Sequence, residues 1–213
     1  MLTWNELLAE IRADLQDDRA ATPRWSDKVL YIYAKDAIRD YSTWFPLRLD
    51  RLELARLGNS FPLPTNFIEE IHVEAPLDTF LEKRSERSGV RYRPNPHAYI
   101  LSGGRLYAET AEPCLYLTYF AAHPVPASET DSPFALSIPE TDIELIRLYV
   151  KAKALGQMRS RQAALDRFKA TSGKRDDNPL GPEVEDLYGE YLRGIQARIR
   201  GGFATLYRTG RLK

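Results

Sequence analysis

The chain has 213 residues, of which 43% are hydrophobic and 28% charged, a composition that is typical of a soluble globular protein and excludes disorder over most of its length. At this length it can form one large domain or two small ones and bury a core without disulfides or metal. Its 30 basic and 30 acidic residues cancel, which excludes an overall field that would draw the molecule onto DNA or an anionic membrane.

The first predicted element is a helix that begins at a capping box. The Thr3 side chain can accept a hydrogen bond from the backbone N–H three residues on, and Glu6 can reach back to the N–H of Thr3. Apolar residues then recur at helical spacing, at Leu7, Leu8, Ile11 and Leu15. One stripe of this helix therefore needs burial.

A second helix is predicted to follow Ser26. Ser26 is a suitable cap, and Trp25 is placed to pack against Leu30 across the first turn. An apolar face continues through Val29, Leu30, Tyr33, Ala34, Ala37, Ile38 and Tyr41. The helix is expected to end at Phe45, because Pro46 cannot continue it and biases the preceding residue towards an extended conformation.

An extended region follows the second helix. Leucines alternate with polar residues from Leu47, and their phase shifts by one near Arg51, which predicts a bulge or a short turn there. A second strand is predicted over 68–73. Within 76–96, a short helix would suit the apolar residues Leu77, Phe80 and Leu81.

The clearest strand signals lie further along the chain. Two apolar triplets, 99–101 and 106–108, flank a turn in which Gly103 and Gly104 can supply positive φ, so a hairpin is predicted. Another strand, rich in aromatic and β-branched residues, is predicted from Cys114 to Ala121. These segments together predict an antiparallel sheet of four to six strands.

The last third of the chain predicts two helices. After a loop dense in proline, serine and alanine, Pro139 suits the first turn of the longest helix, which runs towards Phe168. A polar linker leads to a final helix that Pro182 opens and Gly201-Gly202 ends. The apolar face of this final helix comprises Val184, Leu187, Tyr188, Tyr191, Leu192, Ile195 and Ile199.

These elements predict an α+β fold. Two N-terminal and two C-terminal helices, within 1–46 and 139–200, are expected to form a four-helix bundle-like body. Residues 47–138 are expected to form an inserted domain that contains the antiparallel β meander. Residues 201–213 are expected to form a flexible, extended, basic arm.

No residue pattern predicts catalysis, a cofactor or a metal site. His72, His97 and His123 lack the spacing and the cysteine partners of a zinc site, and we interpret them as a polar strand residue and two loop residues beside prolines. Cys114 lies in an apolar strand, where cysteine normally behaves as a small buried hydrophobe. The adjacent acids Glu69-Glu70 and Asp176-Asp177 are better explained as solvated surface than as a catalytic pair. The protein is therefore predicted not to be an enzyme.

Three features favour a soluble protein that is made in a cytoplasm. A lone cysteine excludes an intrachain disulfide and fits a reducing compartment. No apolar run approaches the roughly 20 residues that cross a bilayer. Met1 leads directly into the capping box rather than into a signal peptide.

The C-terminal segment is the strongest candidate for an interaction site. Between Arg193 and Lys213 there are six basic side chains and no acidic one. Gly201-Gly202 separates the last residues from the final helix, and apolar anchors then alternate with cations. The candidate partner-binding residues are Arg200, Phe203, Leu206, Tyr207, Arg208, Arg211 and Lys213. The alternative is a solvated chain end with no role, but three large apolar anchors are unusual in such a segment.

Three parts of the chain resemble head-to-tail adaptor proteins of tailed bacteriophages, also called neck or tail accessory proteins. The first comprises Thr3-Trp4, Leu7, Ile11-Arg12, Leu15, Asp17, Trp25-Ser26-Asp27, Ile32, Ala37, Tyr41 and Phe45-Pro46. The second runs from Phe61 to Val73, and the third from Leu115 to Pro124.

The resemblance implies a structural virion protein that forms a ring, dodecameric in many members of the family, between portal and tail and helps to retain packaged DNA. The implied partners are the portal protein, other copies of the chain, tail or nozzle proteins and, within the channel, DNA. It implies no cofactor and no membrane partner, and it places the protein in the virion neck after synthesis in the host cytoplasm. In such adaptors the C-terminal segment docks on the portal, so 200–213 would be the docking arm.

Two alternative functions remain open from the residues alone. A nucleic-acid-binding protein could use the cations of 193–213 on phosphates, with an affinity that falls steeply with salt. An uncharacterised enzyme could assemble a site from Asp, Glu and Tyr residues that are distant in the sequence.

Overall fold

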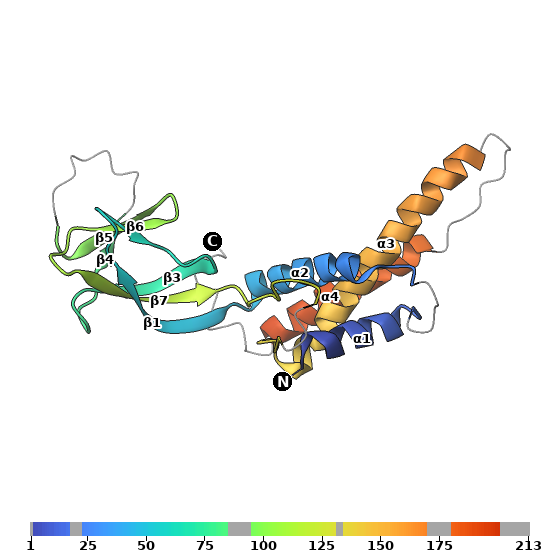
Figure 1. Ribbon diagram of the computed structural model, residues 1–213, viewed down its shortest axis with the longest axis horizontal. Helices are drawn as coiled ribbons and strands as arrows, with labels where there is room; N and C mark the ends of the chain where they lie inside the picture. Colours follow the sequence, from blue (N-terminus) through green and yellow to red (C-terminus); the bar gives the residue numbers. More distant parts are fainter. Residues whose placement is uncertain (1, 18–22, 85–94, 131–133, 170–179, 201–213) are drawn as a thin grey trace. The chain divides into compact units, whose positions relative to one another are not determined.

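The computed structural model describes residues 2–17, 23–84, 95–130, 134–169 and 180–200 (Figure 1). The chain divides into two compact units. One, which we call the helical unit, combines Met1–Phe45 with His123–Lys213, and the other, which we call the β unit, is Pro46–Ala122.

The described residues of the helical unit form four α-helices and one short 3-10 helix. These are α1 (Trp4–Asp14), α2 (Asp27–Trp44), η1 (Glu140–Asp142), α3 (Ile143–Lys169) and α4 (Leu180–Arg198). Both predicted N-terminal caps are confirmed, since Thr3 and Glu6 form the capping box and Ser26 accepts from the backbone N–H of Val29. The helix α4 begins two residues before Pro182, which still lies in the first turn, where its missing N–H has no intrahelical partner to lose.

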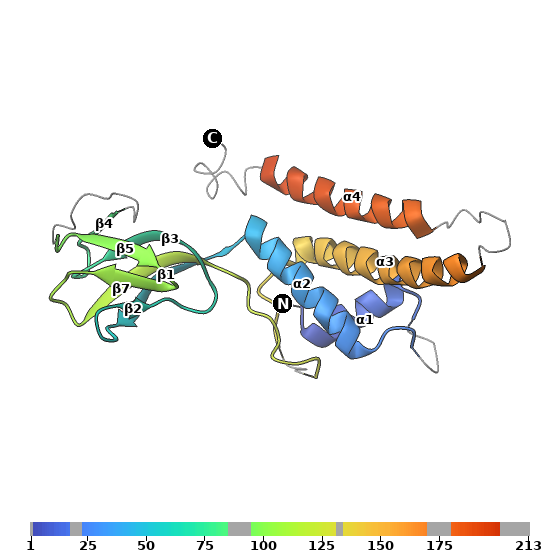
Figure 2. The ribbon, with the colours of Figure 1, turned by 90° about the horizontal axis from the view of Figure 1, so that it is seen from above.

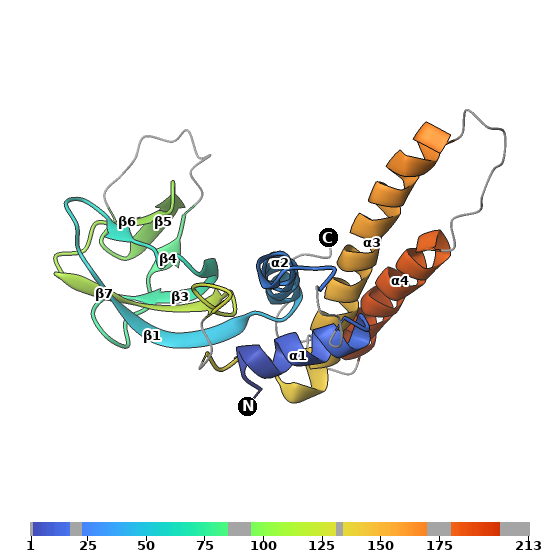
Figure 3. The ribbon, with the colours of Figure 1, turned by 45° about the vertical axis from the view of Figure 1, so that its right-hand side comes forward.

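The helix α3 is the centre of the helical unit. It contacts α4 on one side and α1 and α2 on the other (Figures 2 and 3). The buried core includes the large side chains Trp4, Leu7, Ile11, Leu30, Ile38, Tyr41, Ile146, Val150, Tyr191 and Ile195. The α+β class is confirmed, whereas the more specific four-helix bundle stays a prediction.

The segment between the β unit and η1 belongs to the helical unit, although the sequence pattern placed it in the insertion. Leu136 and Ile138 are buried in the helical core. Backbone hydrogen bonds join Leu136 N–H to the carbonyl of Leu2, and Trp4 N–H to the carbonyl of Phe134. The boundary therefore lies after Ala122 instead of after residue 138, because the apolar residues of this loop are part of the helical core.

The described residues of the β unit form two sheets instead of the single meander expected. One has the order β1-β7-β3 and is antiparallel, and the other has the order β2-β6-β5-β4, with β4 parallel to β5 (Figure 1). The strands are β1 (Leu47–Ala55), β2 (Phe61–Pro62), β3 (Phe67–Glu74), β4 (Glu82–Lys83), β5 (Ala98–Ser102), β6 (Arg105–Ala108) and β7 (Cys114–Ala121). The core of this unit lies around Phe61, Val73, Leu106, Leu115 and Leu117.

Two local predictions in the β unit are confirmed. The pairing of β1 with β7 shifts between Leu49 and Leu52, and Arg51 adopts a positive φ of 53° at that bulge. The hairpin of β5 and β6 turns through Gly103 and Gly104, whose φ values of 55° and 72° explain the need for glycine.

The short helix suggested around Leu77 to Leu81 is wrong. The chain forms a tight turn there, in which Ala75 N–H donates to the carbonyl of Thr79 and Thr79 N–H donates to that of Pro76. These turn hydrogen bonds replace those of a helix, and Leu81 leads directly into β4.

Candidate protein-interaction surfaces

The predicted docking arm lies almost entirely outside the described residues. Arg200 alone is described, and it is exposed just after α4. The other six candidate residues, Phe203, Leu206, Tyr207, Arg208, Arg211 and Lys213, fall in the undescribed 201–213. Their role stays a prediction.

A network of polar side chains anchors the end of α4 from which the arm leaves. Arg198 donates through Nε to Asp142 Oδ1 at 2.8 Å and through a terminal nitrogen to the carbonyl of Thr141 at 2.8 Å. Tyr41 donates to the other oxygen of Asp142 at 2.6 Å, and burial together with this carboxylate raises the pKa of Tyr41. The hydrogen bond to Asp142 also raises the pKa of Arg198. Arg198, one of the six C-terminal cations, therefore belongs to a structural ion pair with Asp142.

The three histidines have different surroundings. His123, expected in a loop, is buried, with Nδ1 2.8 Å from the Ser137 hydroxyl and Nε2 2.9 Å from the carbonyl oxygen of Phe45. Burial lowers the pKa of His123, so its imidazole is neutral at pH 7. The part of the chain that the structure describes contains no group of three His, Cys, Asp or Glu residues that could hold a metal ion.

Cys114 and the first acidic pair lie in the strands where the sequence placed them. Cys114 is half-buried in β7, on the face opposite Leu115, instead of fully buried. Glu69 is exposed, and Glu70 forms an ion pair with Lys83 of β4. The pair Asp176-Asp177 lies outside the described residues.

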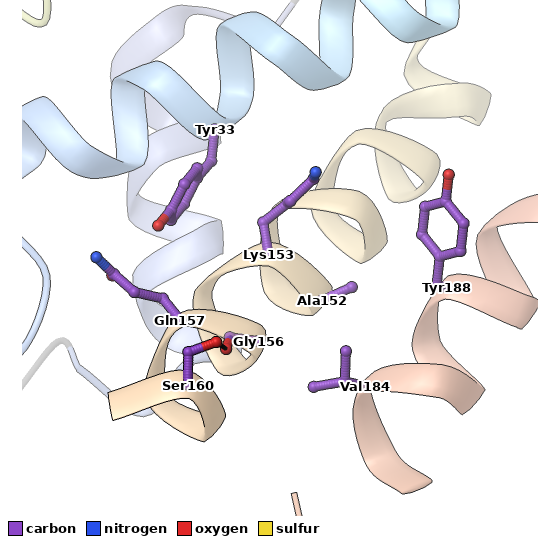
Figure 4. Close-up of a pocket in the computed structure, with 8 residues that line it drawn as sticks. All are labelled: Tyr33, Ala152, Lys153, Gly156, Gln157, Ser160, Val184 and Tyr188. Carbon is purple, nitrogen blue, oxygen red and sulfur yellow. Dashed lines mark hydrogen bonds between the residues drawn. The ribbon is translucent and has the colours of Figure 1, made fainter. Parts of the chain in front are cut away.

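A groove of about 400 Å³ opens among α2, α3 and α4 (Figure 4). Its lining residues are Tyr33 from α2, Ala152, Lys153, Gly156, Gln157 and Ser160 from α3, and Val184 and Tyr188 from α4. Figure 4 shows the hydroxyl of Tyr33 directed towards Gln157, while Val184 and Tyr188 form the wall on the side of α4. The lining residues are aromatic, small, aliphatic or polar, with Lys153 as their charged member and without a pair of facing acids, which suits a contact better than a reaction.

Aromatic packing links α4 to α2 and α3 near this groove. Tyr191 donates a hydrogen bond to Asp40 of α2, and its ring lies edge-on to Tyr149 at 5.3 Å. Lys153 lies over the ring of Tyr149 at 5.3 Å. Burial raises the pKa of Tyr191, so its hydroxyl stays a donor to the carboxylate of Asp40. These contacts fix α4 against α3.

Three large apolar side chains of the helical unit remain exposed among the residues that the structure describes. Ile32 of α2 is 45% exposed, and Tyr188 and Leu192 of α4 are 42% and 37% exposed. The sequence pattern assigned both α4 residues to a buried face. The predicted apolar face of α4 spans more of the helix circumference than α3 can cover. The width of this face in the sequence is the signal that could have indicated a contact of α4 with another protein.

The β unit presents a separate apolar projection at the turn before β4. Glu74 is 1% exposed; it accepts from the backbone N–H of Asp78 at 2.8 Å and lies 3.1 Å from His72 Nε2. Arg51, at the bulge of β1, donates to Asp78 at 2.6 Å. The turn carries the side chains Leu77 and Phe80, which are 45% and 62% exposed. A buried carboxylate therefore stabilises a turn whose apolar side chains face solvent.

Comparison with known families shows that a family model described as SU10 adaptor protein matches residues 2–183. This match covers the whole β unit and most of the helical unit, and it ends in the first turn of α4. No curated protein shows significant similarity to the chain. Within the described residues, none of the helices is both long and apolar enough to span a membrane.

Proposed function

Because this chain belongs to the SU10 adaptor protein family, a family of phage head-to-tail adaptors, we propose that it assembles into a ring between portal and tail. The match over residues 2–183 carries the proposal, since it includes α1, α2, α3 and the whole β unit. The general role, a structural adaptor of the phage virion, follows from the family. The closed ring, its dodecameric stoichiometry and the retention of DNA are the parts that we propose.

The surfaces of both units support an assembly role. Each unit leaves several large apolar side chains exposed, and exposed apolar clusters mark sites of contact with other proteins. A ring multiplies one modest contact between neighbouring copies by symmetry. Portal and tail proteins are the proposed partners on its two faces, and the virion neck is the proposed location.

We further propose that the arm docks on the portal. Its apolar anchors Phe203, Leu206 and Tyr207 would fill pockets, while Arg208 and Arg211 would pair with acidic portal residues. The arm would start after Arg198, because the ion pair with Asp142 holds that residue in the helical unit.

Truncation tests arm docking directly. Deleting the residues after Gly201 is expected to leave a folded protein that no longer co-sediments with purified portal protein. The double variant Phe203→Ser with Tyr207→Ser should behave in the same way, whereas Thr205→Ser with Thr209→Ser should bind like the unchanged chain. Unchanged portal binding by the truncated protein would remove the docking role. If negative-stain images show no ring, either of the protein alone or of the protein mixed with portal, the proposal that it forms a ring is contradicted.

A further inference from the structure

The outward face of α2 is a basic ridge. Lys28, Ile32, Lys35 and Arg39 recur at intervals of four, three and four residues, which places them on one face of the helix. This face is opposite the one that buries Leu30, Ala34 and Ile38. Ile32, at 45% exposure, is the apolar centre of the ridge, and the three cations and the exposed acid Asp36 lie around it.

The first half of α4 is an acidic wall. From Glu183 to Leu192 this helix carries four exposed acids, Glu183, Glu185, Asp186 and Glu190, and no basic residue, while Arg159 of α3 lies 3.5 Å from Glu185. Tyr188 and Leu192, spaced by four residues, form an exposed apolar strip beside these acids. Tyr188 and Val184 also line the groove, so the wall continues into a concave surface.

The ridge and the wall complement each other and cannot complement themselves. Each combines an exposed apolar centre with a net charge, positive on the ridge, where three cations outnumber Asp36, and negative on the wall. Two ridges or two walls would repel, so a symmetric dimer through either surface is disfavoured. A contact between two different surfaces of identical chains is heterologous, and it generates a ring when the rotation closes.

We propose that the basic ridge of one copy packs on the acidic wall and groove of the next copy. Ile32 of one copy then contacts Tyr188 and Leu192 of the next, and this apolar centre loses its contact with water. Around it, Lys35 or Arg39 forms ion pairs with Glu185 or Asp186. The occupant is a second copy because one chain supplies both complementary surfaces, each with an apolar centre that its own core leaves uncovered. This proposal rests on the ring proposed above and assigns the residues that join its subunits.

Charge reversal gives a test that distinguishes this contact from its alternatives. A ridge-reversed chain, Lys35→Glu with Arg39→Glu, should self-associate at least about tenfold more weakly, because like charges then oppose each other. A wall-reversed chain, Glu185→Lys with Asp186→Lys, should be weakened to a similar degree. The variant Arg24→Glu, which reverses an exposed charge in the loop before α2, is the matched control and should assemble normally.

Mixing the two reversed chains is the decisive step. The reversed ridge of one variant then meets the reversed wall of the other, and the two unchanged surfaces also meet, so rings should form again with both chains in equal numbers. Mass photometry and native mass spectrometry of the full-length proteins, with portal added where assembly requires it, measure this rescue. Absence of rescue in soluble, folded variants overturns the proposed contact.

Cysteine pairing provides a second measurement that does not depend on charge. In a Cys114→Ser background, a mixture of Ile32→Cys chains and Leu192→Cys chains should form mixed disulfide dimers under mild oxidation. Neither chain alone should do so, because Ile32 faces Leu192 of another copy and not itself. Dimers formed by either variant alone would indicate a symmetric contact and overturn the proposal.

The outcomes for the ring and for its contact are separable. Normal assembly of the ridge-reversed and wall-reversed chains overturns the contact and leaves the ring intact. Failure of the unchanged chain to assemble, alone or on portal, overturns the ring itself. If the groove instead holds the chain's own arm, the protein truncated after Gly201 will assemble more strongly than the full chain, and the mixture of reversed chains will not be rescued.

Discussion

At the scale of single residues, His123 couples the stability of the helical unit to pH. Burial lowers its pKa in the folded protein below the ordinary value of 6.5, so the unfolded chain binds more protons in the window below that value. The neutral His123 ring contributes fully to the free energy of unfolding above about pH 6.5. Below that value, and down to the lowered pKa of the folded state, this contribution falls by at most about 1.4 kcal/mol per pH unit.

The variant His123→Gln should therefore be less stable at pH 7.5, but its free energy of unfolding should fall less between pH 7.5 and 5.5. All three tryptophans, Trp4, Trp25 and Trp44, lie in the helical unit, so urea unfolding followed by tryptophan fluorescence reports on this unit. His97→Gln is the control, because that histidine lies in the β unit. Equal pH dependence in His123→Gln and the unchanged chain would contradict the assignment.

Glu74 is the residue on which the projecting turn of the β unit depends. Replacing Glu74 by alanine removes the acceptor for the backbone N–H of Asp78 and leaves His72 without its acidic neighbour. The variant should lose about 2 to 3 kcal/mol in the β unit. Glu69→Ala, at an exposed position of the same strand, should change stability by less than about 0.5 kcal/mol.

Hydrogen exchange of the peptides that cover β3 and β4 measures the Glu74 effect without interference from the helical unit. Faster exchange in Glu74→Ala, with unchanged exchange in Glu69→Ala, is the expected pattern. Identical protection in both variants would show that the turn does not depend on the buried carboxylate.

Residue-scale features that depend on neighbours in the sequence could be predicted, and those that depend on tertiary contacts could not. The Thr3 cap and the bulge at Arg51 are encoded within a few residues, and both were found where expected. The burial of His123 depends on two contacts. Phe45 is distant from it in the sequence, and Ser137 is separated from it by an irregular loop. No local pattern distinguishes such a histidine from an exposed one.

At the scale of elements, two glycines report how closely α3 and α4 approach. A Cβ added at Gly156 of α3 would make only an ordinary van der Waals contact with Val184, at 3.8 Å. A Cβ added at Gly194 of α4 would overlap the buried side chain of Leu145. Both glycines lie inside helices, where alanine is intrinsically favoured by about 1 kcal/mol.

Gly156→Ala should therefore raise the stability of the helical unit by up to about 1 kcal/mol, whereas Gly194→Ala should be less stable than Gly156→Ala by at least about 1 kcal/mol. Thermal unfolding of the two variants is compared by circular dichroism at 222 nm, a wavelength at which the signal reports helix content. A gain of equal size in both variants would mean that Leu145 moves aside without cost.

The existence of the elements was easier to predict than the way they pack. Periodicity identified every α-helix, since each carries an apolar stripe, but it could not show that Tyr188 and Leu192 remain exposed. It also suggested a helix at Leu77 to Leu81, where the turn's own hydrogen bonds prevail. The second sheet was missed because β2 and β4 are two residues long, too short for any alternation to appear.

At the scale of the whole molecule, the change of periodicity after Pro46 indicated the start of the β unit, but its end was misplaced. The loop after Ala122 has the composition of a surface connection, and its contacts with α1 and α2 attach it to the helical unit. The interaction surfaces were the least predictable feature, since complementarity between the ridge and the wall requires knowing which helix faces remain uncovered. The sequence could indicate the class of protein through its resemblance to adaptors, but not the residues that join its copies.

The division into two units predicts that the helical unit can fold without the β unit. Among the described residues, its core draws on residues up to Phe45 and after His123. The two ends of the insertion lie together, because His123 N–H donates to the Ser42 hydroxyl at 3.0 Å and His123 Nε2 lies 2.9 Å from the Phe45 carbonyl. Replacing residues 46–122 by a short Gly-Ser linker should therefore close the chain with little strain.

The shortened protein should be helical by circular dichroism and should unfold cooperatively, because every buried contact of the helical core is retained. Residues 46–122 alone should also fold, since the first and last strands of the β unit pair with each other, with Leu47 opposite Ala121. The ridge and the wall both belong to the helical unit, so the shortened chain should still form the contact between copies. Loss of cooperative unfolding in the shortened protein would show that the insertion is required for the helical core, and assembly only by the full chain would move the subunit contact to the β unit.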